Sequence, residues 1–157
     1  RHDSSQDWIP DNTFMAIPTG TSIEYVENNL RFLKLEMPVK QDFSWKGNSY
    51  IDTYSINSAL QYLDDWDYIY DSIDVPLTIN SLSFDSTLKV FQRDESEGDD
   101  PSLPTTQYAD RTYAFEKYAK GVGLIYREFL HWEYQGPESP EYGYKGYGVK
   151  LSIIDHN

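Results

Sequence analysis

YAFEKYAKGVGLIYREFLHW, residues 113–132, is the stretch of sequence that decides the fold of this chain. It holds two runs in which apolar and polar residues alternate, as they do in half-buried β-strands, and the runs meet at Lys120-Gly121-Val122-Gly123. The pattern predicts an antiparallel hairpin near the centre of a sheet. One face of its second strand is expected to carry Val122, Leu124, Tyr126, Glu128, Leu130, Trp132 and Tyr134.

Working outward, shorter runs with the same character predict the strands that pair with this hairpin. They cover residues 22–26, 30–35, 67–73, 82–84 and 88–92 upstream, with Pro76 ending the third, and residues 147–154 as a closing strand. Residues 55–63 (SINSALQYL) are the only helical segment predicted, with Ser55 as its cap. The predicted fold class is therefore mainly β, an antiparallel sheet arranged as a sandwich or a strongly curved open sheet.

Proline, glycine and acidic residues mark the segments expected to lie outside the strands. Residues 1–21 are predicted as an irregular lead-in, and residues 22–157 as a single β-rich domain. Residues 93–107 (RDESEGDDPSLPTTQ) are predicted as a solvated loop. Their spacing does not suit an EF-hand, since Gly98 falls at the fifth position instead of the sixth and Thr105 takes the place of the final glutamate.

Composition excludes several classes of function. The formal net charge of −13, from 26 acidic and 13 basic residues, argues against nucleic-acid binding and against docking on anionic lipid. Without cysteine there is no disulfide framework and no thiolate chemistry. No apolar run approaches the roughly 18 residues of a membrane span. The chain opens on Arg1 without a signal peptide, so we expect a fragment or processed form whose domain is completed by strands further upstream.

The motifs that would mark a catalytic or metal site are incomplete in this sequence. Gly121-Val122-Gly123 lacks the third glycine of a dinucleotide loop and is followed by a strand pattern. His2, His131 and His156 have no second ligand at the spacing of a zinc motif, so no metal and no cofactor are expected. The acids Asp64, Asp65 and Asp67 are the best group for acid/base hydrolysis of a glycan, but acids at such a junction are more often solvated.

Aromatic residues are abundant, with 14 tyrosines, 7 phenylalanines and 4 tryptophans. A ligand-binding platform is predicted from Trp66, Tyr68, Tyr70, Trp132 and Tyr134. Exposed rings of this kind stack on the faces of sugars or on peptide side chains without needing charge, which suits an acidic surface. The alternative is that these rings fill the core or cover one face of the sheet.

Five pieces of the chain carry a resemblance to a known class of protein: residues 28–39 (NNLRFLKLEMPV), 43–48, 62–74, 113–135 and 146–157. They resemble the C-terminal half of uncharacterised Bacteroidetes-type outer-membrane surface lipoproteins. Residues 120–128 (KGVGLIYRE) and the final IIDHN are the most specific parts. Such lipoproteins accompany TonB-dependent nutrient importers, and the resemblance implies a lipid-anchored position on the cell-surface side of the outer membrane, with the acylated cysteine upstream of Arg1.

The resemblance implies a non-enzymatic accessory subunit of an importer for glycans or peptides, with the transporter barrel and its binding lipoprotein as partners. It supplies no active-site residue to place on this chain. Two alternatives come from the residues themselves: a free-standing module that binds carbohydrate or peptide through the aromatic platform, and a glycan hydrolase that uses the acids of residues 64–67.

Overall fold

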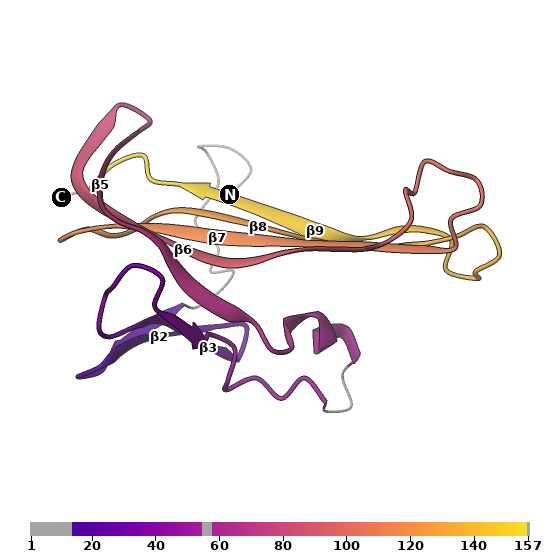
Figure 1. Ribbon diagram of the computed structural model, residues 1–157, viewed down its shortest axis with the longest axis horizontal. Coiled ribbons are helices and arrows are strands. Elements are labelled where there is room, and N and C mark those ends of the chain that lie inside the picture. Colours follow the sequence, from indigo (N-terminus) through magenta and orange to yellow (C-terminus); the bar gives the residue numbers. More distant parts are fainter. Residues whose placement is uncertain (1–13, 55–57, 157) are drawn as a thin grey trace, which may run out of the picture. The chain divides into compact units, whose positions relative to one another are not determined.

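A computed structural model of the chain describes residues 14–54 and 58–156 (Figure 1). The described residues form two compact units. Those of residues 1–38 and 46–65 make up unit 1, and those of residues 39–45 and 66–157 make up unit 2. The region that the sequence predicts as one domain therefore divides into two sets of contacts, and each unit has its own antiparallel sheet.

Unit 1 contains a three-stranded sheet of β1 (Met15–Pro18), β2 (Ser22–Glu27) and β3 (Leu30–Glu36), in that order. The turn between β2 and β3 is Asn28-Asn29, and both residues have positive φ, as a tight hairpin turn requires. The strands predicted over residues 22–26 and 30–35 are confirmed. The predicted helix is a 3₁₀ helix, η1 (Ser58–Leu63), and its expected cap Ser55 lies outside the described residues.

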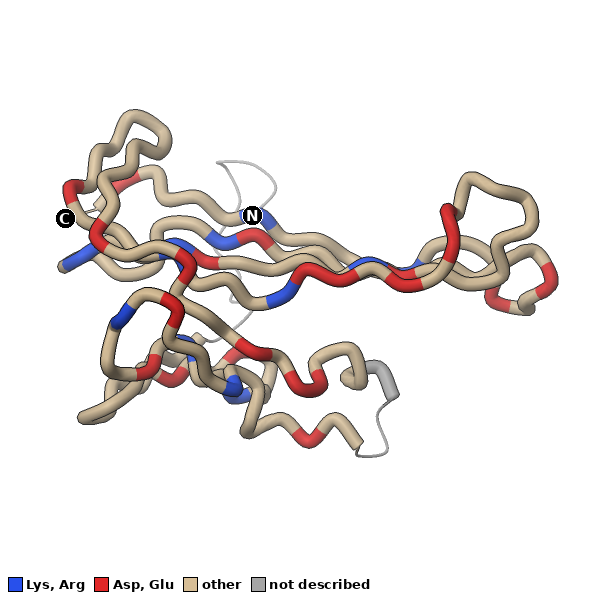
Figure 2. Tube along the Cα trace, in the orientation of Figure 1, with Lys and Arg blue, Asp and Glu red and all other residues tan. Residues whose placement is uncertain are grey.

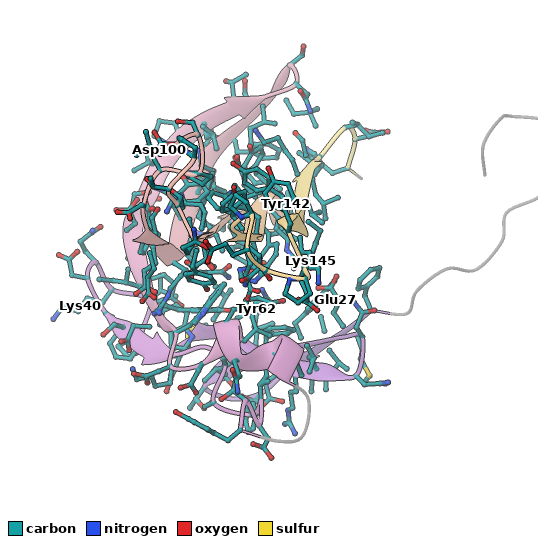
Figure 3. The ribbon with its side chains drawn as sticks, turned by 90° about the vertical axis from the view of Figure 1, so that its right-hand side faces the viewer. Glu27, Lys40, Tyr62, Asp100, Tyr142 and Lys145 are labelled. Atoms are coloured by element: carbon teal, nitrogen blue, oxygen red, sulfur yellow. The ribbon has the colours of Figure 1, made fainter. Side chains whose placement is uncertain are left out.

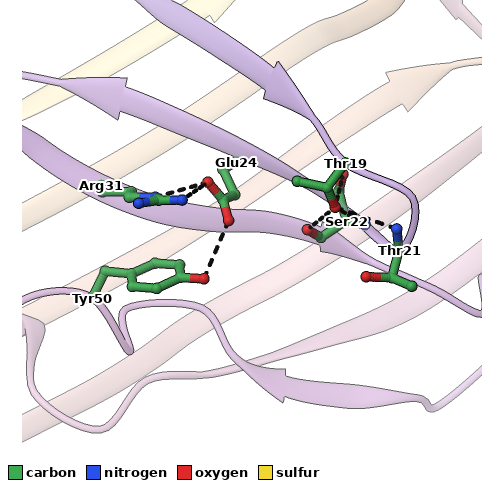
Figure 4. A network of polar contacts seen from close by, with 6 residues as sticks. All are labelled: Thr19, Thr21, Ser22, Glu24, Arg31 and Tyr50. Atoms are coloured by element: carbon green, nitrogen blue, oxygen red, sulfur yellow. Dashed lines mark hydrogen bonds and ion pairs between the residues drawn. The ribbon is translucent and has the colours of Figure 1, made fainter.

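The prediction that residues 1–21 are irregular is wrong for the last part of that range. The strand β1 lies there and pairs with β2 from Met15↔Val26 to Pro18↔Ile23. Pro18 stands at the end of an edge strand, where a missing amide proton costs little. Residues 1–13 of that prediction lie outside the described residues. The β1–β2 turn is held by the Thr19 hydroxyl, which accepts hydrogen bonds from the backbone amides of Thr21 and Ser22 at 3.3 and 2.9 Å (Figure 4).

Glu24 is a buried carboxylate in β2 with partners inside unit 1 (Figure 4). It accepts hydrogen bonds from the Arg31 guanidinium, with Nε at 2.7 Å, and from the Tyr50 hydroxyl at 3.2 Å. The same guanidinium lies over the Tyr50 ring, 4.4 Å from its centroid. Because every carboxylate oxygen has a donor, this charge stays inside a small sheet without being left unpaired.

Unit 2 is built on a six-stranded sheet in the order β4-β5-β6-β7-β8-β9. The strands are β4 (Ser44–Lys46), β5 (Asp67–Ile79), β6 (Leu82–Gly98), β7 (Tyr108–Ala119), β8 (Gly123–Gln135) and β9 (Gly143–Ser152). The hairpin predicted at the glycine turn is confirmed as β7–β8, and β9 is the closing strand. The predicted fold class, mainly β and antiparallel, is confirmed.

Two predictions about this sheet are wrong, and bulges account for one of them. Pro76 does not end β5, because the register with β6 shifts between Val75 and Leu77 and the strand runs through it. Asp85 and Ser86, which fall between the strands predicted over residues 82–84 and 88–92, lie within a continuous β6. Figure 1 shows the β5–β6 hairpin curling away at this end of the sheet.

The prediction of a loop over residues 93–107 is also wrong for the first part of that segment. Residues 93–98 extend β6 and pair with β7 from Arg93↔Ala114 to Gly98↔Ala109. The connection between the two strands is confined to residues 99–107. Figure 2 shows acidic positions along this part of the sheet as well as in the connection.

Buried aromatic side chains gather on one face of the six-stranded sheet, which we call the core face. Trp66, Tyr68 and Tyr70 are among the largest fully buried side chains, and Trp66 stacks on Phe129 of β8 with ring centroids 6.4 Å apart. Trp45 of β4 packs against Tyr70 at 4.7 Å. At the curled end, Phe84, Ala119 and Ile125 form a smaller cluster with Ile153 packed against it.

Candidate binding face

The opposite face of the same sheet carries a second set of aromatic side chains, and the strand register defines it. Residues directly opposite each other on paired strands share a face, and alternate residues of one strand return to it. Arg111, Tyr113, Phe115 and Lys117 follow one another in this way along β7. We call this surface the ladder face.

Five rows of cross-strand neighbours make up the ladder face. In order they are Lys89, Lys117, Tyr126 and Ser152; Phe91, Phe115, Glu128 and Lys150; Asp94, Tyr113, Leu130 and Gly148; Ser96, Arg111, Trp132 and Gly146; Gly98, Ala109, Tyr134 and Tyr144. Each row has at least one aromatic ring. At about 3.4 Å per residue, the five rows cover about 27 Å along the strands.

The rings of the ladder face touch in two groups, one in the first three rows and one in the last two. The Phe115 ring stacks on Tyr126 with centroids 5.4 Å apart and meets the edge of Tyr113 at 5.6 Å. In the last two rows, Tyr144 lies 5.4 Å from Trp132 and 5.0 Å from Tyr134. Aromatic contacts at these separations fix the ring orientations, so the surface is ordered without a ligand.

Two glycines of β9 leave the centre of this surface uncovered. Gly146 is paired with Trp132 and Gly148 with Leu130, so neither of those side chains has a β9 side chain directly opposite it. A Cβ at Gly146 would lie 2.2 Å from the His131 carbonyl oxygen and 2.5 Å from the Trp132 Cα, and its φ is +156°. Glycine at this position is therefore a steric requirement of the β8–β9 pair.

Three cations of the face, two in its first row and one in its fourth, lie over the rings of Phe115 and Tyr113. The Lys89 and Lys117 ammonium groups stand 5.2 and 5.8 Å from the Phe115 centroid, and the Arg111 guanidinium stands 5.4 Å from that of Tyr113. These are cation–π distances, and the rings supply the negative faces. On β7 itself, Arg111 and Lys117 flank the two rings Tyr113 and Phe115 on this face, as the period-two pattern of the strand places them.

The structure divides the predicted aromatic platform between the two faces of the sheet. Trp132 and Tyr134 belong to the ladder face, where Trp132 is half-buried and Tyr134 is buried under Tyr144 and Tyr142. Trp66, Tyr68 and Tyr70 are on the core face with 2% or less of their surface exposed. For these three the alternative interpretation, that the rings fill the core, fits the structure.

Sequence reasoning missed most of the ladder face. Tyr144, which is 63% exposed, lies before the closing strand predicted over residues 147–154, whereas β9 begins at Gly143. Figure 3 shows Tyr142 on the β8–β9 connection and Asp100 on the β6–β7 connection, both at the end of unit 2 where the fifth row of the ladder face lies. One pattern in the sequence could have identified the face. Every second residue from Arg111 to Lys117 is aromatic or basic: Arg111, Tyr113, Phe115 and Lys117.

The two acids of the ladder face are held by neighbouring donors. Glu128 accepts a hydrogen bond from the Tyr126 hydroxyl at 2.7 Å and lies 3.3 Å from the Lys150 ammonium. The Tyr126 hydrogen bond, and then Lys150, hold the pKa of Glu128 below its usual value. Asp94 forms an ion pair with Arg111 at 2.5 Å. A glycosidase acid needs the opposite shift, so Glu128 is suited to being a fixed charge.

The acids that sequence reasoning proposed for hydrolysis have structural partners or face solvent. The carboxylate of Asp64 accepts hydrogen bonds from the hydroxyls of Thr53 at 2.6 Å and Tyr54 at 2.9 Å. Asp65 forms an ion pair with Lys46 at 2.7 Å, and its side chain is 74% exposed. Asp67 is exposed at the start of β5. None of these placements puts an acid in the apolar pocket that acid catalysis requires.

His131 has hydrogen-bonding and charged neighbours within the sheet. His131 is buried in β8 on the core face, with its Nδ1 2.9 Å from the Thr112 hydroxyl and its Nε2 3.8 Å from Glu133. Within residues 14–54 and 58–156, no group of three or more His, Asp or Glu side chains is placed to hold a metal ion. No helix in that part of the chain is long and apolar enough to cross a membrane.

Comparisons with protein-family models, with curated proteins and with solved structures give no match to this chain. The function is therefore argued from the ladder face itself.

Proposed function

We propose that this protein is a non-catalytic carbohydrate-binding module and that the ladder face is its binding surface. The observation that carries the proposal is the presence of at least one aromatic ring in each of five successive rows of one sheet face. Sugar rings present apolar C–H faces that stack on aromatic side chains, and the hydroxyl edges find partners in nearby charged groups. Tyr144 is the one exposed ring of the series and Trp132 is the half-buried ring beside it, and these two would form its principal contacts.

Two features favour binding over hydrolysis. The Glu128 carboxylate is stabilised in its ionised form by Tyr126 and Lys150, so it has no proton to give to a leaving group at neutral pH. The rings are also arranged in a line on an open sheet. A surface of this type suits an extended chain, which a pocket built for one bond would not hold along its length.

The test is a titration of soluble oligosaccharides from a panel of neutral and acidic glycans, read by calorimetry. We expect Trp132→Ala and Tyr144→Ala each to weaken binding at least about tenfold, which corresponds to about 1.4 kcal/mol. The matched control is Tyr54→Ala, which removes an 84% exposed aromatic ring that lies in unit 1. If no glycan binds, or if the control weakens binding as much as the two variants, the proposal is wrong.

The resemblance to surface lipoproteins is the ground for proposing where such a module acts. An accessory subunit of a TonB-dependent importer would present a glycan-binding surface outside the cell and pass its ligand to the transporter. Copurification of the full-length protein from outer membranes tests this part separately. A large barrel transporter is expected in the same fraction, and its consistent absence would remove the importer proposal while leaving the binding module intact.

A further inference from the structure

On β6 to β9 the ladder face carries more basic than acidic residues, whereas the chain as a whole is acidic. The five rows of this face hold four basic residues (Lys89, Lys117, Arg111, Lys150) and two acidic ones (Asp94, Glu128). The chain has 13 basic residues against 26 acidic ones. A surface on which that ratio is reversed is therefore a local feature of the fold, produced by which residues the register brings to this face.

Three of the four cations have a carboxylate partner. Arg111 pairs with Asp94 at 2.5 Å, Lys150 with Glu128 at 3.3 Å, and Lys89 with Asp71 of β5 at 2.7 Å. These pairs are internal to unit 2 and neutralise one another. They leave one of the four cations without a carboxylate partner.

That residue is Lys117. Its ammonium lies 5.8 Å from the Phe115 centroid and 5.9 Å from that of Tyr126, and within the described part of the chain it forms no ion pair. The side chain is half-buried, so its stem lies on the sheet. The rings below it attract the charge but accept none of its conventional hydrogen bonds, so the three donors of the ammonium stay available for an anion above the face.

We infer that the ladder face binds an acidic polysaccharide and that Lys117 takes a carboxylate of one of its uronic-acid residues. This inference rests on the proposed function and names the class of its ligand. Lys117 is in the first row and Trp132 in the fourth, so they stand about 20 Å apart along the strands at about 3.4 Å per residue. A ligand that uses both must be an oligomer.

A nucleic acid fits these observations less well than a uronate polymer. Phosphate-backbone binding depends on many cations that together displace counterions, whereas only one cation in the five described rows of the ladder face lacks an ion pair, and the chain has a net charge of −13. A uronate polymer needs one lysine for one carboxylate and aromatic side chains on which its sugar rings can stack. The ladder face supplies both.

The experiment compares ligands that differ only in charge. Oligomers of polygalacturonate, alginate and hyaluronan are each titrated against the protein beside their methyl-esterified forms, in 0.15 M salt. We expect at least one uronate to bind at least tenfold more tightly than its ester. Lys117→Gln should bring the affinity for the uronate down to that for the ester, whereas Lys117→Arg should keep most of the difference. Lys120→Gln, an exposed lysine in the β7–β8 turn, is the control and should change nothing.

The outcomes distinguish a failure of the uronate inference from a failure of the carbohydrate-binding proposal. If esters and uronates bind equally, or if Lys117→Gln leaves their ratio unchanged, the inference is overturned and the carbohydrate-binding module stands. If none of the three uronates nor any neutral glycan binds, both are wrong. A single-stranded oligothymidylate that binds more tightly than every uronate would also overturn the inference. Amide chemical shifts that move on β7 and β8 at ladder-face residues provide a second readout that needs no variant.

Discussion

Glu116 shows how single residues hold the sheet of unit 2 together. Its carboxylate is 1% exposed on the core face, where it accepts hydrogen bonds from the Gln92 amide at 3.0 Å and the Tyr118 hydroxyl at 2.6 Å. The Arg127 Nε lies 3.6 Å away. Removing one partner of a buried charge cluster leaves the others desolvated and unpaired, which usually costs about 3–5 kcal/mol.

We therefore expect Glu116→Ala to lower the free energy of unfolding by about 3–5 kcal/mol. The measurement is urea unfolding followed by tryptophan fluorescence. Glu138→Ala, which removes an exposed carboxylate from the β8–β9 connection, should stay within about 0.5 kcal/mol of the parent protein. Equal losses in the two variants would mean that Glu116 is not the centre of a coupled cluster.

His131 makes the stability depend on pH near neutrality. Burial lowers the pKa of His131 below its usual value, although the charges of Glu133 and Asp110 act in the opposite direction. The unfolded chain has an ordinary histidine pKa of about 6.5, so below that pH it binds a proton more readily than the folded protein does. The contribution to stability is therefore complete above about pH 6.5 and is lost as the pH falls toward the folded-state pKa.

The test compares the parent protein with His131→Gln by urea unfolding between pH 7.5 and 5.0. The parent should lose more stability than the variant below pH 6.5, by no more than about 1.4 kcal/mol per pH unit, the value for one proton. The carboxylates titrate in both proteins and cancel in the difference. Parallel curves would show that His131 has the same pKa in the folded and unfolded chain.

At the scale of elements, the β7–β8 hairpin could be predicted because its information is local. Alternation gave both strands, and the turn needs the glycine at 121, whose φ is +78°. Val122 donates a hydrogen bond to the Ala119 carbonyl at 3.1 Å to close the turn. The predicted face of β8 is correct from Tyr126 to Tyr134, since a strand without a bulge keeps its alternation.

Neighbouring strands were harder to predict because acidity and bulges hide the alternation. Residues 93–98 read as a loop by composition, yet as a strand their acids fall on both faces and remain solvated, beside Arg111 and Thr112 of β7. The register of β6 shifts between Phe91 and Arg93, and a shift of one residue reverses the face of every later side chain. Which residues of this segment share a face with the aromatic residues of β7 therefore follows from a bulge that the sequence does not mark.

The β8–β9 pair offers a test of why its glycines are there. Gly146→Ala should destabilise the protein by about 1–3 kcal/mol, because its φ of +156° suits only glycine and its Cβ would meet backbone atoms of β8. Gly148→Ala is the matched control. Its Cβ would lie 3.3 Å from the Leu130 Cδ1, the end of a side chain that can move, so a change within about 0.5 kcal/mol is expected.

Thermal and urea unfolding of the two variants decide the matter. If Gly148→Ala costs as much as Gly146→Ala, then packing of the whole edge strand, and not the backbone at residue 146, sets the requirement. The comparison also bears on the ladder face, since a side chain at either position would stand beside Trp132 or Leu130.

At the scale of the whole molecule, charge is distributed unevenly, and this gives binding an unusual dependence on salt. The chain carries −13 in total, whereas the ladder face holds four basic and two acidic residues. In 0.15 M salt the screening length is about 8 Å, so a bound uronate responds mainly to Lys117 and its neighbours. In 0.01 M salt that length is about 30 Å, and the acidic residues of the entire chain then repel the same ligand.

We therefore expect the affinity for an acidic oligosaccharide to fall when salt is lowered from 0.15 to 0.01 M. Affinity for its methyl ester should stay constant, because the ester has no charge to be repelled. A protein that binds polyanions through a broad basic surface behaves in the opposite way, with affinity rising steeply as salt is removed. Calorimetric titrations of both ligands at the two salt concentrations measure the effect. An affinity for the uronate that rises as salt is withdrawn would mean that the acidic residues lie too far from the ladder face to act on its ligand, and that the local charge alone governs binding.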